Sequence, residues 1–248
     1  MELKLFKDDS ELGVFASRRA ATILHQALQE KGKANLILAT GASQFSVLEN
    51  LVEENIDWSR VTMFHLDEYI NLPEDHPASF RGYLRERFLD KINNQCTHHL
   101  IDGNQPKPRE ECQRLSQLIQ EHPIDVALIG IGENGHLAFN DPPADFETTE
   151  PYIVVNLDKS CRQQQLGEGW FKSLEEVPMQ AISMSIHQIM ISHHLIVSVP
   201  DTRKARAVKN AVEGPLTNEC PASILREHEN CHLLLDEGSA SLLTNRLK

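Results

Sequence analysis

A histidine, an amide and a carboxylate lie close together in residues 132–141, and these groups can move protons. His136 stands between Asn134 and Asp141, and glycines precede it at positions 132 and 135. Histidine titrates near neutral pH, so it can accept and donate a proton, and the glycines permit a tight loop. A turn whose histidine bonds only to backbone fits these residue types equally well. His136, Asn134 and Asp141 are therefore candidate catalytic residues.

An apolar run at residues 61–64 is followed by the sequence Asp67-Glu68-Tyr69. A carboxylate half-sheltered at the end of a strand can have its pKa raised by desolvation, which makes it a usable base for a proton on carbon. The commoner role of an isolated Asp–Glu pair is a turn or helix cap in which both acids are solvated. The residue types leave both roles open, and Asp67 is the candidate base.

Thr40, Gly41, Ala42 and Ser43 lie between a predicted strand and a predicted helix. Backbone N–H groups and hydroxyls at such a junction can bind an anion. The segment lacks the Gly-Lys-Ser/Thr ending of a nucleotide-binding loop and the full glycine pattern of a dinucleotide site. Lys204, at a later strand-to-helix junction, can supply positive charge to a bound phosphate, although most lysines are simply solvated.

Two other kinds of active site are not indicated. The adjacent pairs His98-His99 and His193-His194 have side chains that diverge on a strand, and no His-x-x-x-His with an acidic partner falls on a predicted helix. We therefore expect no metal ion. We also expect no serine hydrolase chemistry, because the chain has no Gly-x-Ser-x-Gly motif.

Charge and cysteine content restrict the partners and the compartment. The 248 residues carry 36 acidic and 24 basic side chains, a net charge of -12, which disfavours nucleic acid but permits a small anion bound by local cations. Five cysteines without a Cys-x-x-Cys pair fit a reducing compartment. No apolar run is long enough to span a bilayer, and the first residues do not read as a signal peptide. We expect a cytoplasmic protein with no membrane or nucleic-acid partner.

The elements that must position these residues are short buried strands alternating with amphipathic helices. The predicted strands are residues 36–38, 61–64, 126–129, 182–184, 195–197 and 233–235. This alternation predicts a doubly wound, Rossmann-like α/β fold with a mostly parallel sheet and helices on both faces. Neither a repeat nor a linker divides the chain, so residues 1–248 are expected to form one domain.

Helix ends and loops follow from the same pattern. We expect Asp9 or Ser10 to cap the first helix, Gly32 to end it, Ser43 to cap the second, Pro108 to begin another and Gly214 to end the last. Ligands of such sheets collect at the carboxyl ends of the strands. Four polar loops, at residues 40–43, 67–69, 132–141 and 200–204, are therefore expected to meet in one crevice.

Taken in order, several segments resemble the glucosamine-6-phosphate deaminase family along nearly the whole chain. They are Leu38-Ala39-Thr40-Gly41-Ala42-Ser43, Leu66-Asp67-Glu68-Tyr69, His76-Pro77-Ala78-Ser79-Phe80, residues 132–142, Arg203-Lys204-Ala205 and Ala211-Val212-Glu213-Gly214. The Asp-Glu-Tyr and Gly-His-x-x-Phe-Asn elements separate this chain from the related 6-phosphogluconolactonases, which usually have Asp-Glu-Arg and lack Phe-Asn.

The resemblance implies a reaction without metal or organic cofactor, in which glucosamine 6-phosphate gives fructose 6-phosphate and ammonia. His136 would help to open the sugar ring, and Asp67 would move a proton from C2 to C1. Lys204, residues 41–43 and Arg162 would bind the phosphate. The expected partner is a small amino-sugar phosphate, and a homo-oligomer is compatible with the sequence.

Two residues depart from the family's pattern and two alternatives stay open. Asn134 replaces an aspartate and brings no negative charge to an imidazolium, while Asp141 replaces a glutamate and is one methylene shorter. Residues 143–147 are acidic rather than basic, so allosteric activation by N-acetylglucosamine 6-phosphate is not expected. The alternatives are an enzyme of the same fold acting on galactosamine 6-phosphate or 6-phosphogluconolactone, and a non-catalytic sugar-phosphate sensor.

Overall fold

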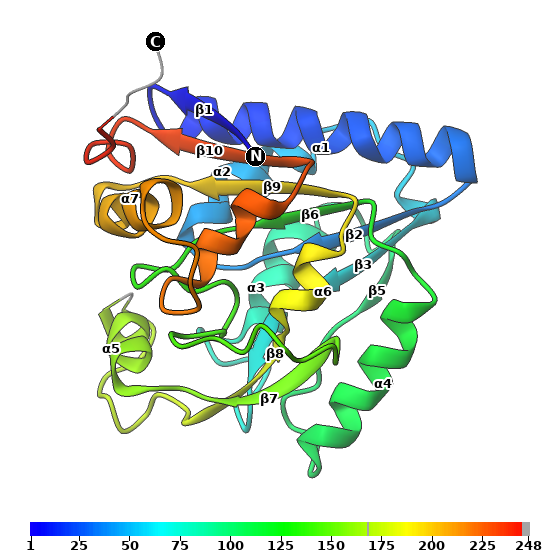
Figure 1. Cartoon of the computed structure of the whole chain (residues 1–248). Coiled ribbons are helices and arrows are strands. Elements are labelled where there is room, and N and C mark those ends of the chain that lie inside the picture. Colours follow the sequence, from blue (N-terminus) through cyan, green and yellow to red (C-terminus); the bar gives the residue numbers. More distant parts are fainter. Residues whose placement is uncertain (168, 245–248) are drawn as a thin grey trace.

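A seven-stranded parallel sheet forms the centre of the molecule (Figure 1). The computed structural model describes residues 1–167 and 169–244. In spatial order the strands are β1 (Glu2–Phe6), β10 (Cys231–Asp236), β9 (His194–Val199), β6 (Val126–Ile129), β2 (Ala34–Leu38), β3 (Val61–His65) and β5 (Thr97–His99). The chain winds outward from β2 towards β5 and from β6 towards β10. The point at which the winding reverses, where ligands of such folds bind, therefore lies between β2 and β6.

Helices cover both faces of this sheet, as predicted (Figure 1). They are α1 (Asp9–Lys31), α2 (Phe45–Leu51), α3 (Phe80–Leu84), α4 (Pro108–Gln120), α5 (Lys159–Gly167), α6 (Ile186–Met190) and α7 (Ala205–Glu213). Shorter turns are η1 (Ala42–Gln44), η2 (Trp58–Arg60), η4 (Thr202–Lys204) and η5 (Pro221–Glu227), all 3₁₀, and the π-helical turn η3 (Arg85–Leu89).

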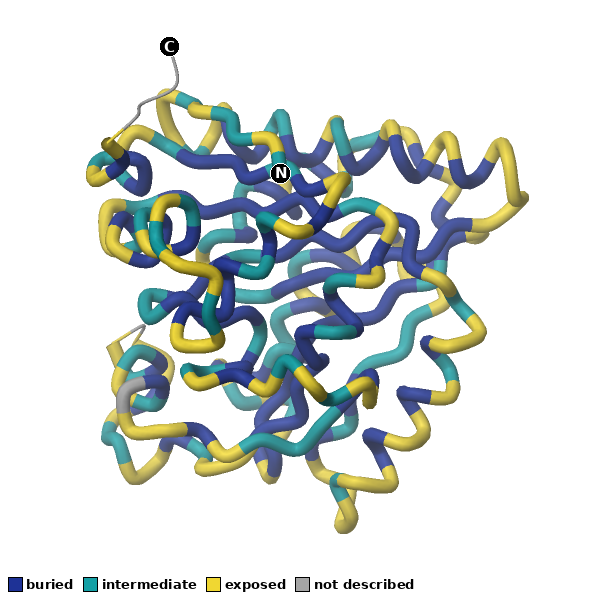
Figure 2. The backbone as a smooth tube through the Cα atoms, in the orientation of Figure 1, coloured by how far each residue is buried: buried dark blue, intermediate teal, exposed yellow. Residues whose placement is uncertain are grey.

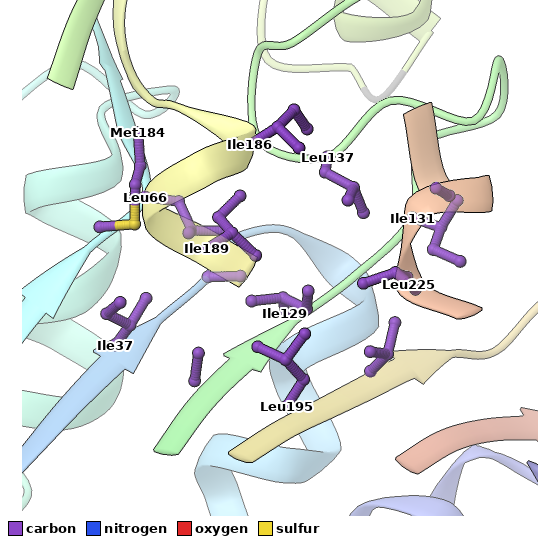
Figure 3. Close-up of a cluster of buried hydrophobic side chains, with 14 of the residues drawn as sticks. Ile37, Leu66, Ile129, Ile131, Leu137, Met184, Ile186, Ile189, Leu195 and Leu225 are labelled. Carbon is purple, nitrogen blue, oxygen red and sulfur yellow. The ribbon is translucent and has the colours of Figure 1, made fainter. Parts of the chain in front are cut away.

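Alternating side chains of the strands build two apolar layers, because successive residues of a strand point to opposite faces. Leu36 and Leu38 join a buried cluster with α1 and α2, whereas Ile37 joins a second cluster with α4, α6 and α7. Figure 3 shows part of the second cluster, with Ile37 and Leu195 on the strand side of the α6 residue Ile189. The inner strands of the parallel sheet are mostly buried, whereas its edge strands β1 and β5 are partly exposed, and most other exposed residues lie on helices and loops (Figure 2). The sheet is thus a rigid base for its loops.

A second, antiparallel sheet of three strands lies beside the main one. Its order is β4 (Asp67–Tyr69), β8 (Gln180–Met184) and β7 (Tyr152–Asn156). The predicted strand at residues 182–184 exists, but its expected place among the parallel strands was wrong. Its residues Ile182 and Met184 are fully buried, and such an apolar run looks the same in sequence whether its neighbours run parallel or antiparallel.

The helix ends are partly as predicted. Asp8, one residue before the two expected caps, accepts a hydrogen bond from the backbone of α1, and Gly32 ends that helix with a positive φ of 77°. Pro108 is the first residue of α4, and Gly214 follows the last residue of α7. Ser43 lies inside η1 and makes no cap, because α2 begins two residues later.

Within the described residues, no helix combines the length and the apolar character that crossing a membrane requires.

Candidate active site

A cavity of about 440 Å³ opens at the carboxyl ends of the parallel strands, and the four predicted loops meet in it. Its lining includes residues 39–43 after β2 and residues 66 and 67 after β3. It also includes residues 130–132 and 136, which follow β6, and residues 200, 201, 203 and 204, which follow β9. These strand ends point to the left in Figure 1. The cavity contains the switch point between β2 and β6, as the fold leads one to expect.

Asp67 lies on the wall of this cavity with only 7% of its surface exposed. Burial, reinforced by the neighbouring charge of Glu68, raises the pKa of Asp67 to about 8. A carboxyl group with this pKa can both take and return a proton near neutral pH. The role of a solvated cap, which the sequence left open for the Asp–Glu pair, is excluded by the burial of both side chains.

Glu68 has a different task, because its carboxylate is fully buried and points to protein donors. It accepts five hydrogen bonds: from the backbone N–H groups of Tyr69, Phe80 and Arg81, from the Ser79 hydroxyl and from the Arg81 guanidinium at 3.1 Å. Arg81 is itself buried and also binds Asp102 at 3.2 Å. Burial raises the pKa of Glu68, and these donors act against that rise. They also fix the strand β4 that carries Asp67.

His136 faces the same cavity from the loop after β6. Its ring lies against Gly132, where an added Cβ atom would come within 2.2 Å of Cε1 and Nε2. The backbone of Gly132 donates to the His136 carbonyl at 3.0 Å, which closes the loop. Glycine at 132 is therefore needed for the imidazole to occupy this position, a role that the sequence did not reveal.

Asp141 and Asn134 both contact His136 and hold it in place. His136 Nδ1 lies 3.3 Å from Asp141 Oδ1, so the shorter aspartate side chain still contacts the imidazole directly. Asn134 donates its amide to the same oxygen at 3.0 Å, and its amide oxygen accepts the backbone N–H of His136 at 3.0 Å. Burial acts to raise the pKa of Asp141, but the adjacent His136, the Asn134 amide and Cys161 hold it below its ordinary value.

Thr40, Gly41, Ala42, Ser43 and Lys204 all line the cavity, and that they bind an anion stays a prediction. Gly41 has a φ of 96°, which glycine adopts readily and other residues rarely do.

The structure adds Arg203, which sequence reasoning had passed over. It lines the cavity beside Lys204 and contacts Asp201 at 2.8 Å and Glu133 at 3.6 Å. Its position next to Lys204 at a strand-to-helix junction is the signal that could have identified it.

Arg162 is not brought to the cavity. Its guanidinium donates to the backbone carbonyls of Leu174 and Val177, and it is absent from the described lining. Gln164 and Gln165 of the same helix α5 do line the cavity, and Gln165 accepts a hydrogen bond from the Tyr69 hydroxyl at 2.7 Å. Two amides therefore stand where α5 borders the cavity.

No group of three or more acidic, histidine or cysteine side chains suited to a metal occurs in residues 1–167 and 169–244.

Comparison with known proteins agrees with this geometry. Residues 7–234 match the family of glucosamine-6-phosphate isomerases and 6-phosphogluconolactonase. A glucosamine-6-phosphate deaminase of Exiguobacterium sibiricum is 38% identical over 211 residues, 85% of this chain and 82% of that protein. The enzyme of the same name from Lactobacillus delbrueckii subsp. bulgaricus is 35% identical and is aligned over 98% of this chain and 100% of its own length.

Solved structures give the same result. A monomeric glucosamine-6-phosphate deaminase superposes with a TM-score of 0.89 at 32% identity, covering 98% of this chain and 100% of that one. A 6-phosphogluconolactonase from Trypanosoma brucei has a TM-score of 0.80 at 18% identity, covers 98% of each chain and shares the fold alone. Because both the family match and these relatives extend over nearly its full length, the chain belongs to the glucosamine-6-phosphate isomerase/6-phosphogluconolactonase family.

Proposed function

We propose that this protein converts glucosamine 6-phosphate and water into fructose 6-phosphate and ammonia. The observation that carries the proposal is that a buried carboxyl group, Asp67, and an imidazole, His136, line one cavity together with the residue 40–43 loop and Lys204. The cavity thus combines a base for a carbon-bound proton, an acid–base group for the sugar ring and polar groups for a phosphate. Relatives of 35% and 38% identity bear the name of this activity.

The reaction begins with ring opening. His136 moves the proton of the C1 hydroxyl to the ring oxygen, and the open-chain aldehyde results. Asp141, ionised and 3.3 Å from Nδ1, stabilises the imidazolium while it carries this proton. Asn134 has no charge to add, but its amide holds the Asp141 oxygen in place.

Isomerisation and deamination follow. Asp67, once ionised, takes the proton from C2 and returns it to C1, so that the enolamine becomes a ketose imine. Water adds to C2 of the imine, the C2–N bond breaks, and ammonia leaves. One carboxyl group suffices because its pKa of about 8 lies near working pH, where both the acceptance and the return of a proton are feasible.

The phosphate is assigned to the residue 40–43 loop, with Lys204 and Arg203 as its counter-charges. Holding the open chain at its far end keeps C1 and C2 beside Asp67, which lowers the entropic barrier to proton transfer. Arg162 has no part in this assignment, because its guanidinium is bonded to backbone carbonyls.

The test is a coupled assay that measures ammonia and fructose 6-phosphate. Glucosamine 6-phosphate, galactosamine 6-phosphate and 6-phosphogluconolactone are supplied separately, and the first is expected to be the substrate. Asp67→Asn should abolish ammonia release while it still binds glucosamine 6-phosphate. Acid production from the lactone, or turnover of the galacto epimer alone, would identify the alternative enzyme, and binding without any turnover would identify a sensor.

We also infer a cytoplasmic location and a monomeric state. The described structure contains five cysteines, all buried and none in a disulfide, which fits the reducing cytoplasm proposed for this protein. The relative solved as a monomer makes a monomer the simplest expectation. Light scattering of the purified protein would distinguish this state from a homo-oligomer.

A further inference from the structure

Tyr83 reaches the loop at residues 40–43 from a different part of the fold. It lies in α3, 42 residues along the chain from Gly41, and its hydroxyl donates to the Gly41 carbonyl at 3.0 Å. The same oxygen accepts the backbone N–H of Gln44 at 3.1 Å. A carbonyl oxygen has two lone pairs, and both are occupied here, so the direction of this carbonyl is fixed.

Fixing the carbonyl also fixes the next N–H group. In a trans peptide the C=O of one residue and the N–H of the following residue point in opposite directions. Capture of the Gly41 carbonyl by Tyr83 therefore directs the N–H of Ala42 away from α3. Ala42 lines the cavity, and within the described structure its N–H donates to no protein acceptor.

The Tyr83 side chain is itself held in place by two neighbouring side chains. Its ring stacks on Phe45 with centroids 5.8 Å apart and an interplanar angle of 20°. The Arg87 guanidinium lies over Phe45 at 4.1 Å and over Tyr83 at 5.4 Å. Burial raises the pKa of Tyr83, so the phenol stays protonated and remains a donor.

The helix that carries Tyr83 is anchored to the strand of the proposed base. Arg81, two residues earlier in α3, forms a buried ion pair with Glu68 at 3.1 Å, and Glu68 adjoins Asp67. The short helix α3 therefore contacts the strand that carries Asp67, through Arg81, and the residue 40–43 loop, through Tyr83. A displacement of α3 would therefore change the spacing between Asp67 and the residue 40–43 loop.

We propose that Tyr83 is a positioning residue that holds the Gly41–Ala42 peptide in the conformation that binds the substrate phosphate. The inference rests on the proposed function, because it takes phosphate to be the group bound by residues 40–43. Tyr83 acts through the peptide and not by touching the reacting atoms. Its loss should therefore weaken phosphate binding and leave the proton transfers unaffected.

Tyr83→Phe tests this, because it removes only the hydroxyl and keeps the ring that stacks on Phe45. We expect the Kd for inorganic phosphate, measured by titration calorimetry, to rise roughly threefold to tenfold, the effect of one neutral hydrogen bond. KM for glucosamine 6-phosphate should rise by the same factor, with kcat unchanged. Thr22→Val is the matched control, since the Thr22 hydroxyl also donates to a backbone carbonyl, that of Arg18 at 2.8 Å, within α1.

The outcomes separate this inference from the proposed function. Equal phosphate affinity in wild type and Tyr83→Phe would overturn the inference, as would a fall in kcat without a change in that affinity. If the wild type releases no ammonia but Tyr83→Phe still weakens phosphate binding, the inference stands and the deaminase activity is refuted. A wild-type protein that binds no phosphate at all would overturn both.

Discussion

Replacing Asp67 by asparagine should stabilise the fold while it removes the proposed base. The folded protein holds this carboxyl group with a pKa of about 8, against an ordinary value of 3.8. At pH 7 the group is therefore largely neutral when folded and ionised when unfolded, so that the unfolded state is favoured by the release of a proton. Asparagine has nearly the same shape and no proton to release.

The size of the effect follows from linkage. A raised folded-state pKa contributes stability that is complete below the unfolded pKa and is lost as pH rises through the folded pKa. For Asp67 the loss runs from about pH 4 to about pH 8 at about 1.4 kcal/mol per pH unit. Asp67→Asn lacks this loss. Between pH 5 and pH 8, the free energy of unfolding of the variant relative to that of the wild type should therefore rise by about 3 to 4 kcal/mol.

Urea denaturation at pH 5, 6, 7 and 8 measures this difference directly. Other titrating groups are common to both proteins and cancel in the comparison. Asp75→Asn serves as the matched control, because Asp75 is exposed, and its curve should follow the wild type. If wild type and Asp67→Asn change in parallel across this pH range, the carboxyl group of Asp67 is not held neutral by its surroundings, and the acid–base role assigned to it loses its basis.

Two further substitutions test the other parts of the site. Gly132→Ala would place a Cβ atom 2.2 Å from the His136 ring, so we expect kcat to fall roughly 10²-fold or more, whereas Gly167→Ala, where a Cβ meets nothing within 4 Å, should be neutral. An unchanged kcat in Gly132→Ala would remove His136 from the reaction. Lys204→Gln should raise KM roughly tenfold to a hundredfold with little change in kcat, the effect of one charge-assisted hydrogen bond to phosphate. The exposed Lys33→Gln is its control, and equal KM values in the two variants would show that Lys204 does not bind the phosphate.

The groups that sequence reasoning placed correctly lie at the ends of strands. Asp67, His136 and Lys204 each lie in the segment that follows a buried parallel strand, and parallel strands bring their carboxyl ends to one edge. Their convergence could be predicted from the pattern of runs and loops. Arg162 was different, because its helix α5 follows a strand of the small antiparallel sheet, and no rule of the parallel sheet governs where its side chains point.

The contacts that sequence reasoning did not predict join residues far apart in the chain. The hydroxyl of Tyr83 and the carbonyl of Gly41 are separated by 42 residues, and the spacing of α3 gives no sign that one of its side chains leaves the helix for a loop. The same holds for Glu68, which accepts four of its five hydrogen bonds from residues 79–81. Residue types show that a group can bind a proton, but only the packing shows whether five donors already surround it.

Two aspartates of the site have opposite pKa shifts, and this contrast supports the roles proposed for them. Both are largely buried, yet the pKa of Asp67 is raised to about 8 while that of Asp141 is lowered. The difference lies in their neighbours: Asp67 adjoins the carboxyl group of Glu68, which raises its pKa further, whereas Asp141 lies beside His136, Asn134 and Cys161, which lower it. Asp141 therefore stays ionised and stabilises a protonated imidazole, while Asp67 can change its protonation state near neutral pH. Exchanging these tasks would require exchanging the surroundings and not the residue type, which is aspartate in both places.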